Sequence, residues 1–377
     1  MLLKLGPHKF LHPNEWQEKG QTYGNSSHFA NTPISNIWLQ GRGVPLFSGS
    51  MKTLLFSTHQ FQLVAHCNGS HENQLVARPP LLPGKRPDWL KVRIPAPEVV
   101  DEVAALMRGK NLVTVCEEAR CPNLNECWGV HRTATFMLMG DTCTRHCGFC
   151  NVGKGQPGEL DPGEPQRVAE AVASLKLKFA VVTSVNRDDL PDGGAAHFAQ
   201  TIRWIRSLNE SCGVEVLIPD FRGNNDALNA VLEARPEVLN HNVETVPHLY
   251  KRVRPDADYA QSMAVLNRAA MHRDSSQPDL RTKSGIMVGL GETPEQVLEL
   301  MKDWRAARVN IATLGQYLPP TRSHLPLQRF VDPAEFDMYR QKGLEMGFQQ
   351  VESGPLVRSS YHAKESLEAA SLWETSA

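Results

Sequence analysis

The sequence lacks three features that would place it in a special class of protein. No hydrophobic run in its 377 residues approaches the roughly 20 that a membrane-spanning helix needs. Neither charge is in excess, because 40 Lys and Arg stand against 41 Asp and Glu. Eight cysteines are too few for a disulfide scaffold in a chain of this length. The composition therefore predicts neither a membrane nor a nucleic-acid partner.

The first 80 residues have few features of a folded domain. No acidic residue occurs between Glu18 and Glu72, and this stretch shows poor hydrophobic periodicity. We expect a poorly ordered region, or a misassigned start with translation beginning at Met51 or later. An acidic-poor leader is also typical of an organelle transit peptide, although arginine is sparse, and no small-residue cleavage site of a secretory signal follows Met51. We expect a cytoplasmic protein, with organelle targeting left open.

Beyond this region, apolar β-type runs alternate with helical patterns. The runs cover residues 133–140, 179–185, 214–218, 238–243, 284–289 and 309–314. Helical spacing occurs at 99–107, 165–175, 195–208, 225–234, 260–271, 294–307 and 333–346. Tandem strand–helix units predict an α/β fold, a parallel sheet with helices on its outer face. Six units rather than eight predict a partial (β/α)6 barrel of the TIM type, with its chemistry at the carboxyl ends of the strands.

Two further segments complete the expected organisation. We expect a cysteine-rich N-terminal extension at 81–130, the barrel at 131–348 and a C-terminal closing segment with a tail at 349–377. The first 80 residues then stand outside the folded unit.

The cysteines are unevenly distributed, because six crowd into two triplets and only Cys67 and Cys212 stand apart. The triplet Cys143, Cys147 and Cys150 has C-x3-C-x2-C spacing and follows the first predicted strand. Thiolates this close on one loop converge on a single centre, and three of them leave one iron of a four-iron cluster open. A zinc knuckle is the alternative, although zinc ligands usually come as separated pairs.

The other triplet lies upstream, in a stretch rich in Glu, Arg and Asn. Cys116, Cys121 and Cys127 have C-x4-C-x5-C spacing. Buried, inert thiols are the alternative interpretation, but so polar a stretch rarely buries three thiols for packing alone. We therefore expect a second cluster, which needs a fourth ligand from elsewhere in the chain.

These motifs resemble a known family. The C-x3-C-x2-C loop after the first strand, with Phe149 before its last cysteine, resembles the signature of the radical S-adenosylmethionine superfamily. The run CEEARCPNLNECW, leading into FMLMGDTCTRHCGFC, is similar to the lipoyl synthases in particular. The resemblance extends from about Arg86 to Ala363 and implies two 4Fe-4S clusters, with S-adenosyl-L-methionine as cosubstrate.

The resemblance also implies roles for individual residues. The family's auxiliary cluster takes a serine from an Arg-Ser-Ser-Tyr motif, which implies Ser359 as fourth ligand, with Ser360 as the fallback. His241 is not expected to act as a base, because hydrogen abstraction by a radical needs none. Contacts to the cosubstrate are expected from residues at the strand ends: Thr183, Ser184, Asn242, Glu244, Arg254, Gly289 and Glu292.

The implied reaction is insertion of two sulfur atoms, at C6 and C8, into an octanoyl group on a lysine of a lipoyl carrier domain. The implied partners are E2 subunits of 2-oxoacid dehydrogenases, the glycine cleavage H protein and an electron donor such as ferredoxin or flavodoxin. Another two-cluster sulfurtransferase, a methylthiotransferase or a biotin-synthase-like enzyme, is the alternative within the superfamily. A zinc-stabilised binding protein is the alternative from a different class.

Overall fold

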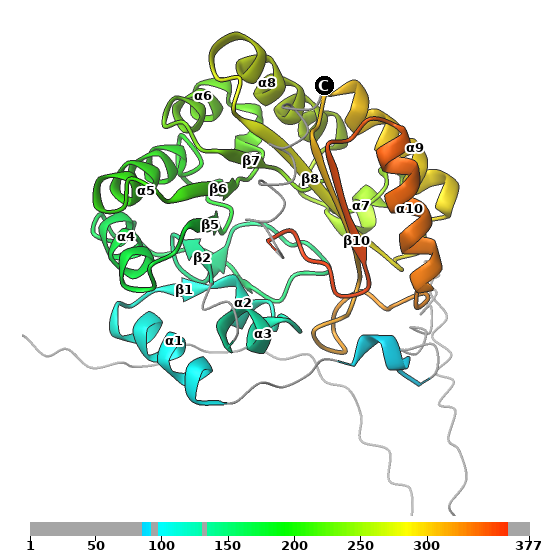
Figure 1. Ribbon diagram of the computed structural model, residues 1–377, viewed down its shortest axis with the longest axis horizontal. Helices are drawn as coiled ribbons and strands as arrows, with labels where there is room; N and C mark the ends of the chain where they lie inside the picture. Colours follow the sequence, from blue (N-terminus) through cyan, green and yellow to red (C-terminus); the bar gives the residue numbers. More distant parts are fainter. Residues whose placement is uncertain (1–84, 92–96, 130–133, 361–377) are drawn as a thin grey trace, which may run out of the picture. The chain divides into compact units, whose positions relative to one another are not determined.

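The structure is a computed structural model that describes residues 85–91, 97–129 and 134–360 (Figure 1). The predictions for residues 1–80, and for the tail beyond residue 360, lie outside this part of the chain. Within it, no helix is long and apolar enough to cross a membrane.

The core is an eight-stranded sheet in the order β1-β2-β5-β6-β7-β8-β9-β10. Its strands from β2 onward run parallel, and β1 pairs antiparallel with β2. The strands are β1 (Val113–Thr114), β2 (Thr135–Leu138), β5 (Phe179–Ser184), β6 (Gly213–Leu217), β7 (Val238–Asn240), β8 (Arg281–Val288), β9 (Ile311–Gln316) and β10 (Gln350–Gly354). Two short strands, β3 (Thr142–Cys143) and β4 (Gly153–Lys154), form a separate pair at the two ends of the loop with Cys143, Cys147 and Cys150.

Helices connect successive parallel strands and lie outside the curved sheet (Figure 1). They are α4 (Glu164–Ser174), α5 (Ala195–Leu208), α6 (Asn225–Glu233), α8 (Tyr259–Ser276), α9 (Pro294–Ala306) and α10 (Pro333–Glu345). Local sequence fixes where they begin: Asp258 caps α8, and Thr293 forms a reciprocal capping box with Gln296 at the start of α9.

Shorter helices complete the fold. They are η1 (Asp88–Leu90), α1 (Pro97–Gly109), α2 (Val115–Glu118), α3 (Leu124–Gly129), η2 (Phe221–Gly223), η3 (Pro247–Leu249) and α7 (Tyr250–Val253). The first four lie in the cysteine-rich extension, and the last three occupy loops at the carboxyl ends of β6 and β7. These last three therefore lie at the carboxyl-end face of the barrel.

The prediction of a parallel α/β barrel is confirmed, because six strand–helix units follow one another from β2 to α10. Two details differ from the expectation. The segment of Cys116, Cys121 and Cys127 carries two short helices, α2 and α3, which are not among the predicted helical ranges. The closing segment contributes an unexpected strand, β10, which pairs with β9. The expected domain boundaries stay predictions.

Candidate active site

A cavity of about 590 Å³ lies at the carboxyl ends of the strands, where parallel barrels place their chemistry. Its size is in the range of small-molecule binding sites, roughly 300–1,000 Å³. Both cysteine triplets line it, together with the first serines that follow β10. Two groups of thiols that are separate in the sequence thus face one space.

The loop of Cys143, Cys147 and Cys150 is held on several sides. The amide of Gly148 donates to the carbonyl of Val253 at 2.9 Å, and the carbonyl of Gly148 accepts from Leu325 N at 3.0 Å. Segments that follow β7 and β9 therefore fix the middle of the loop. Burial, together with the neighbouring thiols of Cys147 and Cys143, raises the pKa of Cys150 to about 11.

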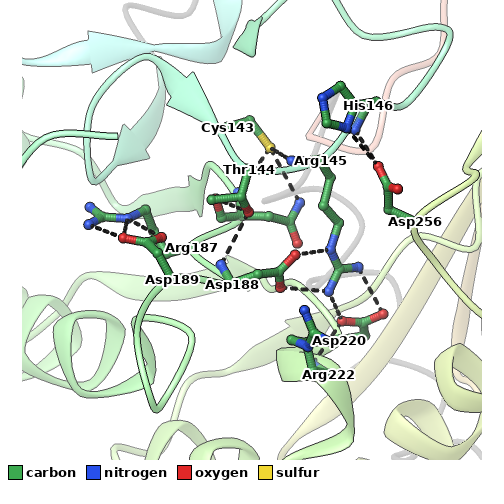
Figure 2. A network of polar contacts seen from close by, with 11 residues as sticks. Cys143, Thr144, Arg145, His146, Arg187, Asp188, Asp189, Asp220, Arg222 and Asp256 are labelled. Atoms are coloured by element: carbon green, nitrogen blue, oxygen red, sulfur yellow. Dashed lines mark hydrogen bonds and ion pairs between the residues drawn. The ribbon is translucent and has the colours of Figure 1, made fainter. Parts of the chain in front are cut away.

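A buried arginine between two of these cysteines ties the loop to the sheet (Figure 2). Arg145 forms ion pairs with Asp188 at 2.7 Å and with Asp220 at 2.6 Å. Although burial opposes ionisation of Asp220, the Arg145 guanidinium holds the pKa of that carboxyl well below its usual range. His146 points the other way and pairs with Asp256 at the exposed surface, at 3.1 Å. It is therefore not oriented as a fourth ligand.

The first triplet in chain order consists of Cys116, Cys121 and Cys127, and the helices α2 and α3 present it to the cavity. Cys116 is buried on α2, whose N-terminus is capped by the Thr114 hydroxyl, and Cys127 lies on α3. Burial, together with the other thiols of the same triplet, raises the pKa of Cys116 to about 11 and that of Cys127 to about 12. These thiolates are therefore unfavourable unless a cation compensates them, which is the role of a bound metal.

The segment after β10 crosses over this triplet. Asn123 Nδ2, in the loop between Cys121 and α3, donates to the carbonyl of Leu356 at 2.7 Å. Asn242 Nδ2 donates to Ser359 Oγ at 2.8 Å, and Ser359 lines the cavity. The guanidinium of Arg358 interacts electrostatically with Cys121. The structure thus brings the predicted fourth ligand to the same cavity as the first triplet, across more than 200 residues of chain.

The polar residues predicted at the ends of β5 and β7 also line the cavity. Three of them keep buried atoms without a hydrogen-bond partner in the described part of the chain: Ser184 Oγ, Asn242 Oδ1 and Arg254 Nε. Thr183 is different, because its hydroxyl donates to the carbonyl of Leu217 at 2.9 Å. Unpartnered polar atoms inside a cavity fit a polar cosubstrate that would pair with them.

Glu244 follows β7, and Arg254, at the end of α7, lies near it. Desolvation raises the pKa of Glu244, whereas the nearby Arg254 and a hydrogen bond from Asn242 lower it. Arg254 Nη1 donates to the carbonyl of Asn242 at 2.8 Å and to Tyr250 Oη at 3.0 Å. The arginine is therefore fixed in place, with its Nε side unused.

Gly289 and Glu292 are not among the residues that line the cavity. The Glu292 carboxylate accepts the amides of Gly289 at 2.5 Å and Leu290 at 3.0 Å, within the turn that follows β8. Gly289 adopts φ +102°, which only glycine accommodates readily. In this structure both residues shape the turn, and a direct contact to the cosubstrate stays a prediction.

The arrangement of the possible ligands distinguishes an iron–sulfur cluster site from a site for a single metal ion. In residues 85–91, 97–129 and 134–360, no three His, Cys, Asp or Glu side chains are arranged to hold one metal ion. Each iron of a cluster takes its own thiolate, so the sulfurs must surround a larger volume than one ion occupies. All six triplet cysteines are free thiols. Three free thiols on each of two short segments that face one cavity therefore fit iron–sulfur clusters.

Some residues of the site escaped the sequence analysis. Arg145 lies inside the second cysteine motif, and its position between two ligands was an available signal. Its partner Asp220 is 75 residues away and carries no local signal. Asn186, whose amide donates to Cys143 Sγ at 3.3 Å, was not predicted as a site residue.

A partial barrel whose first parallel strand leads into a C-x3-C-x2-C loop defines an enzyme of the radical S-adenosylmethionine class. The family model for the radical SAM superfamily matches residues 137–303. A second model, the N-terminal domain of lipoyl synthase, matches residues 71–121. The cofactors of this enzyme are 4Fe-4S clusters and S-adenosyl-L-methionine.

Relatives narrow the class to one family. The chain is 59% identical over 279 residues to the lipoyl synthase of Chloroflexus aurantiacus, covering 74% of this chain and 90% of the relative. It is 57% identical to that of Rubrobacter xylanophilus, covering 76% and 87%. For the lipoyl synthase of Pseudomonas fluorescens the identity is 54%, covering 74% and 81%. The chain belongs to the lipoyl synthase family.

Solved structures with a similar fold are more distant. Methylornithine synthase is 14% identical, with 56% of this chain and 61% of that chain covered and a TM-score of 0.42. The FeFe-hydrogenase maturase HydG is also 14% identical, with 61% and 57% covered and a TM-score of 0.43. Likenesses at this level carry no argument about the reaction.

Proposed function

We propose that this enzyme converts an octanoyl group, amide-linked to a lysine of a lipoyl carrier domain, into a lipoyl group. Sulfur would be inserted at C6 and C8 of the chain. The observation that supports the proposal is that two triplets of free thiols line one cavity of about 590 Å³. A single space that faces both centres lets an acyl chain meet the radical source and the sulfur source without leaving the barrel.

Cys143, Cys147 and Cys150 are proposed to hold the cluster that binds S-adenosyl-L-methionine. When bound, this cluster supplies the electron that splits the sulfonium and yields a 5′-deoxyadenosyl radical. The chain's own part is to orient the cosubstrate. The unpartnered Nε of Arg254 suits its carboxylate, and Ser184 Oγ suits a hydroxyl or amino group.

Cys116, Cys121, Cys127 and Ser359 are proposed to hold the auxiliary cluster, which supplies the inserted sulfur. An alkoxide is a harder and weaker ligand for iron than a thiolate. A corner that is held by serine therefore suits a cluster that is dismantled during the reaction. The bond from Asn242 to Ser359 supports this assignment, because it fixes the hydroxyl at the cavity wall.

The acyl carriers that we propose are E2 subunits of 2-oxoacid dehydrogenases and the glycine cleavage H protein. Both present the same chemical group, an acylated lysine at the tip of a small domain. We further propose ferredoxin or flavodoxin as electron donor. The free thiols suit a reducing compartment, and we infer that the enzyme acts in the cytoplasm.

The test separates the two triplets. Anaerobically reconstituted protein is incubated with an octanoyl-lysine peptide, reductant and S-adenosyl-L-methionine, and both products are measured by mass spectrometry. Replacing Cys143, Cys147 and Cys150 by Ala should abolish 5′-deoxyadenosine. Replacing the other triplet by Ala should keep cosubstrate cleavage and stop sulfur insertion.

The lone Cys212, buried away from the cavity, supplies the control. Cys212→Ala should retain both products. Lipoyl peptide made by the variant that lacks Cys116, Cys121 and Cys127 would contradict the proposed sulfur source. Colourless wild-type protein that holds zinc would contradict both cluster assignments.

A further inference from the structure

Arg145 has a structural position that the proposed reaction leaves unexplained. It lies between two proposed cluster ligands, and only 3% of the residue is exposed. Nε and Nη2 of its guanidinium donate to the two oxygens of Asp188, at 2.7 and 2.9 Å. Nη1 and Nη2 donate to the two oxygens of Asp220, at 3.0 and 2.6 Å. Both pairs are bidentate, so the orientation of the group is fixed as well as its charge.

The two carboxylates come from neighbouring strands. Asp188 follows β5 and Asp220 follows β6, so a single guanidinium ties the cysteine loop to the carboxyl ends of two adjacent strands (Figure 2). Burying a cation together with two anions is costly, because each group loses its hydration. The bidentate pairs that offset this cost fix residue 145 to the ends of β5 and β6.

The backbone on either side of Arg145 is joined to the loop after β5. Thr144 N donates to the carbonyl of Asn186 at 3.1 Å, and Thr144 Oγ1 donates to the same oxygen at 3.0 Å. The amide of Asp188 donates to Thr144 Oγ1 at 3.1 Å. Residues 186–188 therefore run alongside residues 143–145, and the ion pairs of Arg145 lock this alignment.

The alignment brings N–H donors to the sulfur of Cys143. The amides of Asn186 and Arg145 donate to Sγ at 3.3 and 3.5 Å, and Asn186 Nδ2 donates at 3.8 Å. Hydrogen bonds to a ligand sulfur stabilise its negative charge. They favour the reduced state of an iron–sulfur cluster and so raise its reduction potential.

We propose that Arg145 is a positioning residue that holds the Cys143 sulfur against the amide of Asn186 and thereby sets the reduction potential of the cluster that Cys143 ligates. The inference rests on the proposed assignment of Cys143 as a cluster ligand. Lysine cannot replace this arginine, because an ammonium group is a point charge without the planar fork that engages two carboxylates. A merely stabilising ion pair would change the unfolding free energy and leave the potential unaltered.

The experiment measures the potential directly. Wild type, Arg145→Lys and Asp188→Asn are reconstituted anaerobically, and the S-adenosylmethionine-responsive signal is followed by electron paramagnetic resonance during a redox titration. We expect a lower midpoint potential in both variants, with the larger shift in Arg145→Lys. We also expect a rate of cosubstrate cleavage lower by about tenfold or more.

Arg187 supplies the matched control, because it is equally buried and pairs with Asp189 on the same loop without reaching the cysteines. Arg187→Lys should keep the wild-type midpoint. Asp188→Asn retains the pairing of Arg145 with Asp220, so it decides the question if Arg145→Lys loses its cluster. A wild-type midpoint in Asp188→Asn would then overturn the proposal, as would a wild-type midpoint in a cluster-loaded Arg145→Lys.

Failure of the proposed function looks different from failure of this inference. If Cys143→Ala keeps the S-adenosylmethionine-responsive signal, the ligand assignment is wrong and the proposal falls with it. If the signal disappears in Cys143→Ala while the midpoint is the same in wild type, Arg145→Lys and Asp188→Asn, only the role of Arg145 is wrong.

Discussion

The backbone carbonyl of Val357 lies directly against Gly315 of β9, so closely that a Cβ on this glycine would collide with it. The same Cβ would lie 3.2 Å from Arg358 Nη1. The segment that carries the proposed serine ligand therefore reaches the cavity by passing over a position without a side chain. Its path depends on the absence of one methyl group.

Gly315→Ala should displace this segment and separate Ser359 from the first cysteine triplet. We expect less iron per chain after reconstitution and little lipoyl product, while 5′-deoxyadenosine formation continues. Overpacking of this kind costs about 1–3 kcal/mol, so the barrel itself should still fold. Iron analysis and the two product assays test the prediction together.

Gly354 provides a matched control at the end of β10. A Cβ there would meet Val357 Cγ2 at 3.4 Å, an ordinary contact, so Gly354→Ala should behave as wild type. Full iron content and normal product in Gly315→Ala would show that the segment can shift without losing the ligand.

Ser359 and Ser360 allow a direct test of the fourth ligand. Both line the cavity, but Ser359 Oγ is the one held by Asn242 Nδ2, at 2.8 Å. Ser359→Ala should give a fragile auxiliary cluster and little lipoyl product, whereas Ser360→Ala should retain both. Iron content and Mössbauer spectra of the two variants provide the measurement. The opposite pattern would move the assignment to Ser360.

The long helices and most strands were predictable because their signals are local. The spacing of apolar residues predicted a helix at 195–208, and α5 spans Ala195–Leu208. The strand β10 was missed because its residues alternate between buried and half-buried positions, without the continuous apolar run of an interior strand. An edge strand of this kind becomes recognisable only when its neighbour, β9, is known.

The cysteine triplets were predictable for the same reason, since the residues of each motif are close in sequence. The relationships between loops were not. Neither the approach of Arg145 to Asp220 nor that of Asn242 to Ser359 can be read from spacing, because 75 and 117 residues separate the partners. Such contacts are set by the order in which the parallel strands join the sheet.

A buried ion pair inside the barrel yields a prediction about stability. Lys283 Nζ lies 3.0 Å from Glu215 Oε2, with side chains 0% and 1% exposed, and Asn240 Nδ2 donates to the other carboxylate oxygen at 2.9 Å. Lys283→Met should lower the unfolding free energy by about 3–5 kcal/mol, because it leaves an uncompensated buried carboxylate. Urea denaturation of the cluster-free protein measures this loss.

The double variant Glu215→Gln/Lys283→Met is the control for that loss. It removes both charges and keeps an acceptor for Asn240, so it should recover most of the stability. If the double variant is as unstable as Lys283→Met alone, the cost comes from packing, and burial of an unpaired charge is not its cause.

The last prediction concerns the pH dependence of stability and rests on His241. Burial, reinforced by the nearby Arg254, lowers the pKa of His241 from 6.5 to about 4, and its Nδ1–H donates to the carbonyl of Ile218 at 2.9 Å. At a pH between these two values, the imidazole of residue 241 is protonated in the unfolded chain and neutral in the folded protein. Stability is therefore present above pH 6.5 and is lost as the pH falls towards the folded pKa of about 4. From about pH 7 to about pH 5 this residue should account for a loss of roughly 2 kcal/mol in the unfolding free energy.

His241→Asn keeps a donor for Ile218. In this variant the unfolding free energy of the cluster-free protein, measured by urea denaturation at several pH values, should lose this part of its dependence on pH. His248 is exposed, so His248→Asn is the control and should keep the pH dependence of the wild type. An equal slope in wild type and His241→Asn would mean that this imidazole is protonated at the same pH in the folded and unfolded chain.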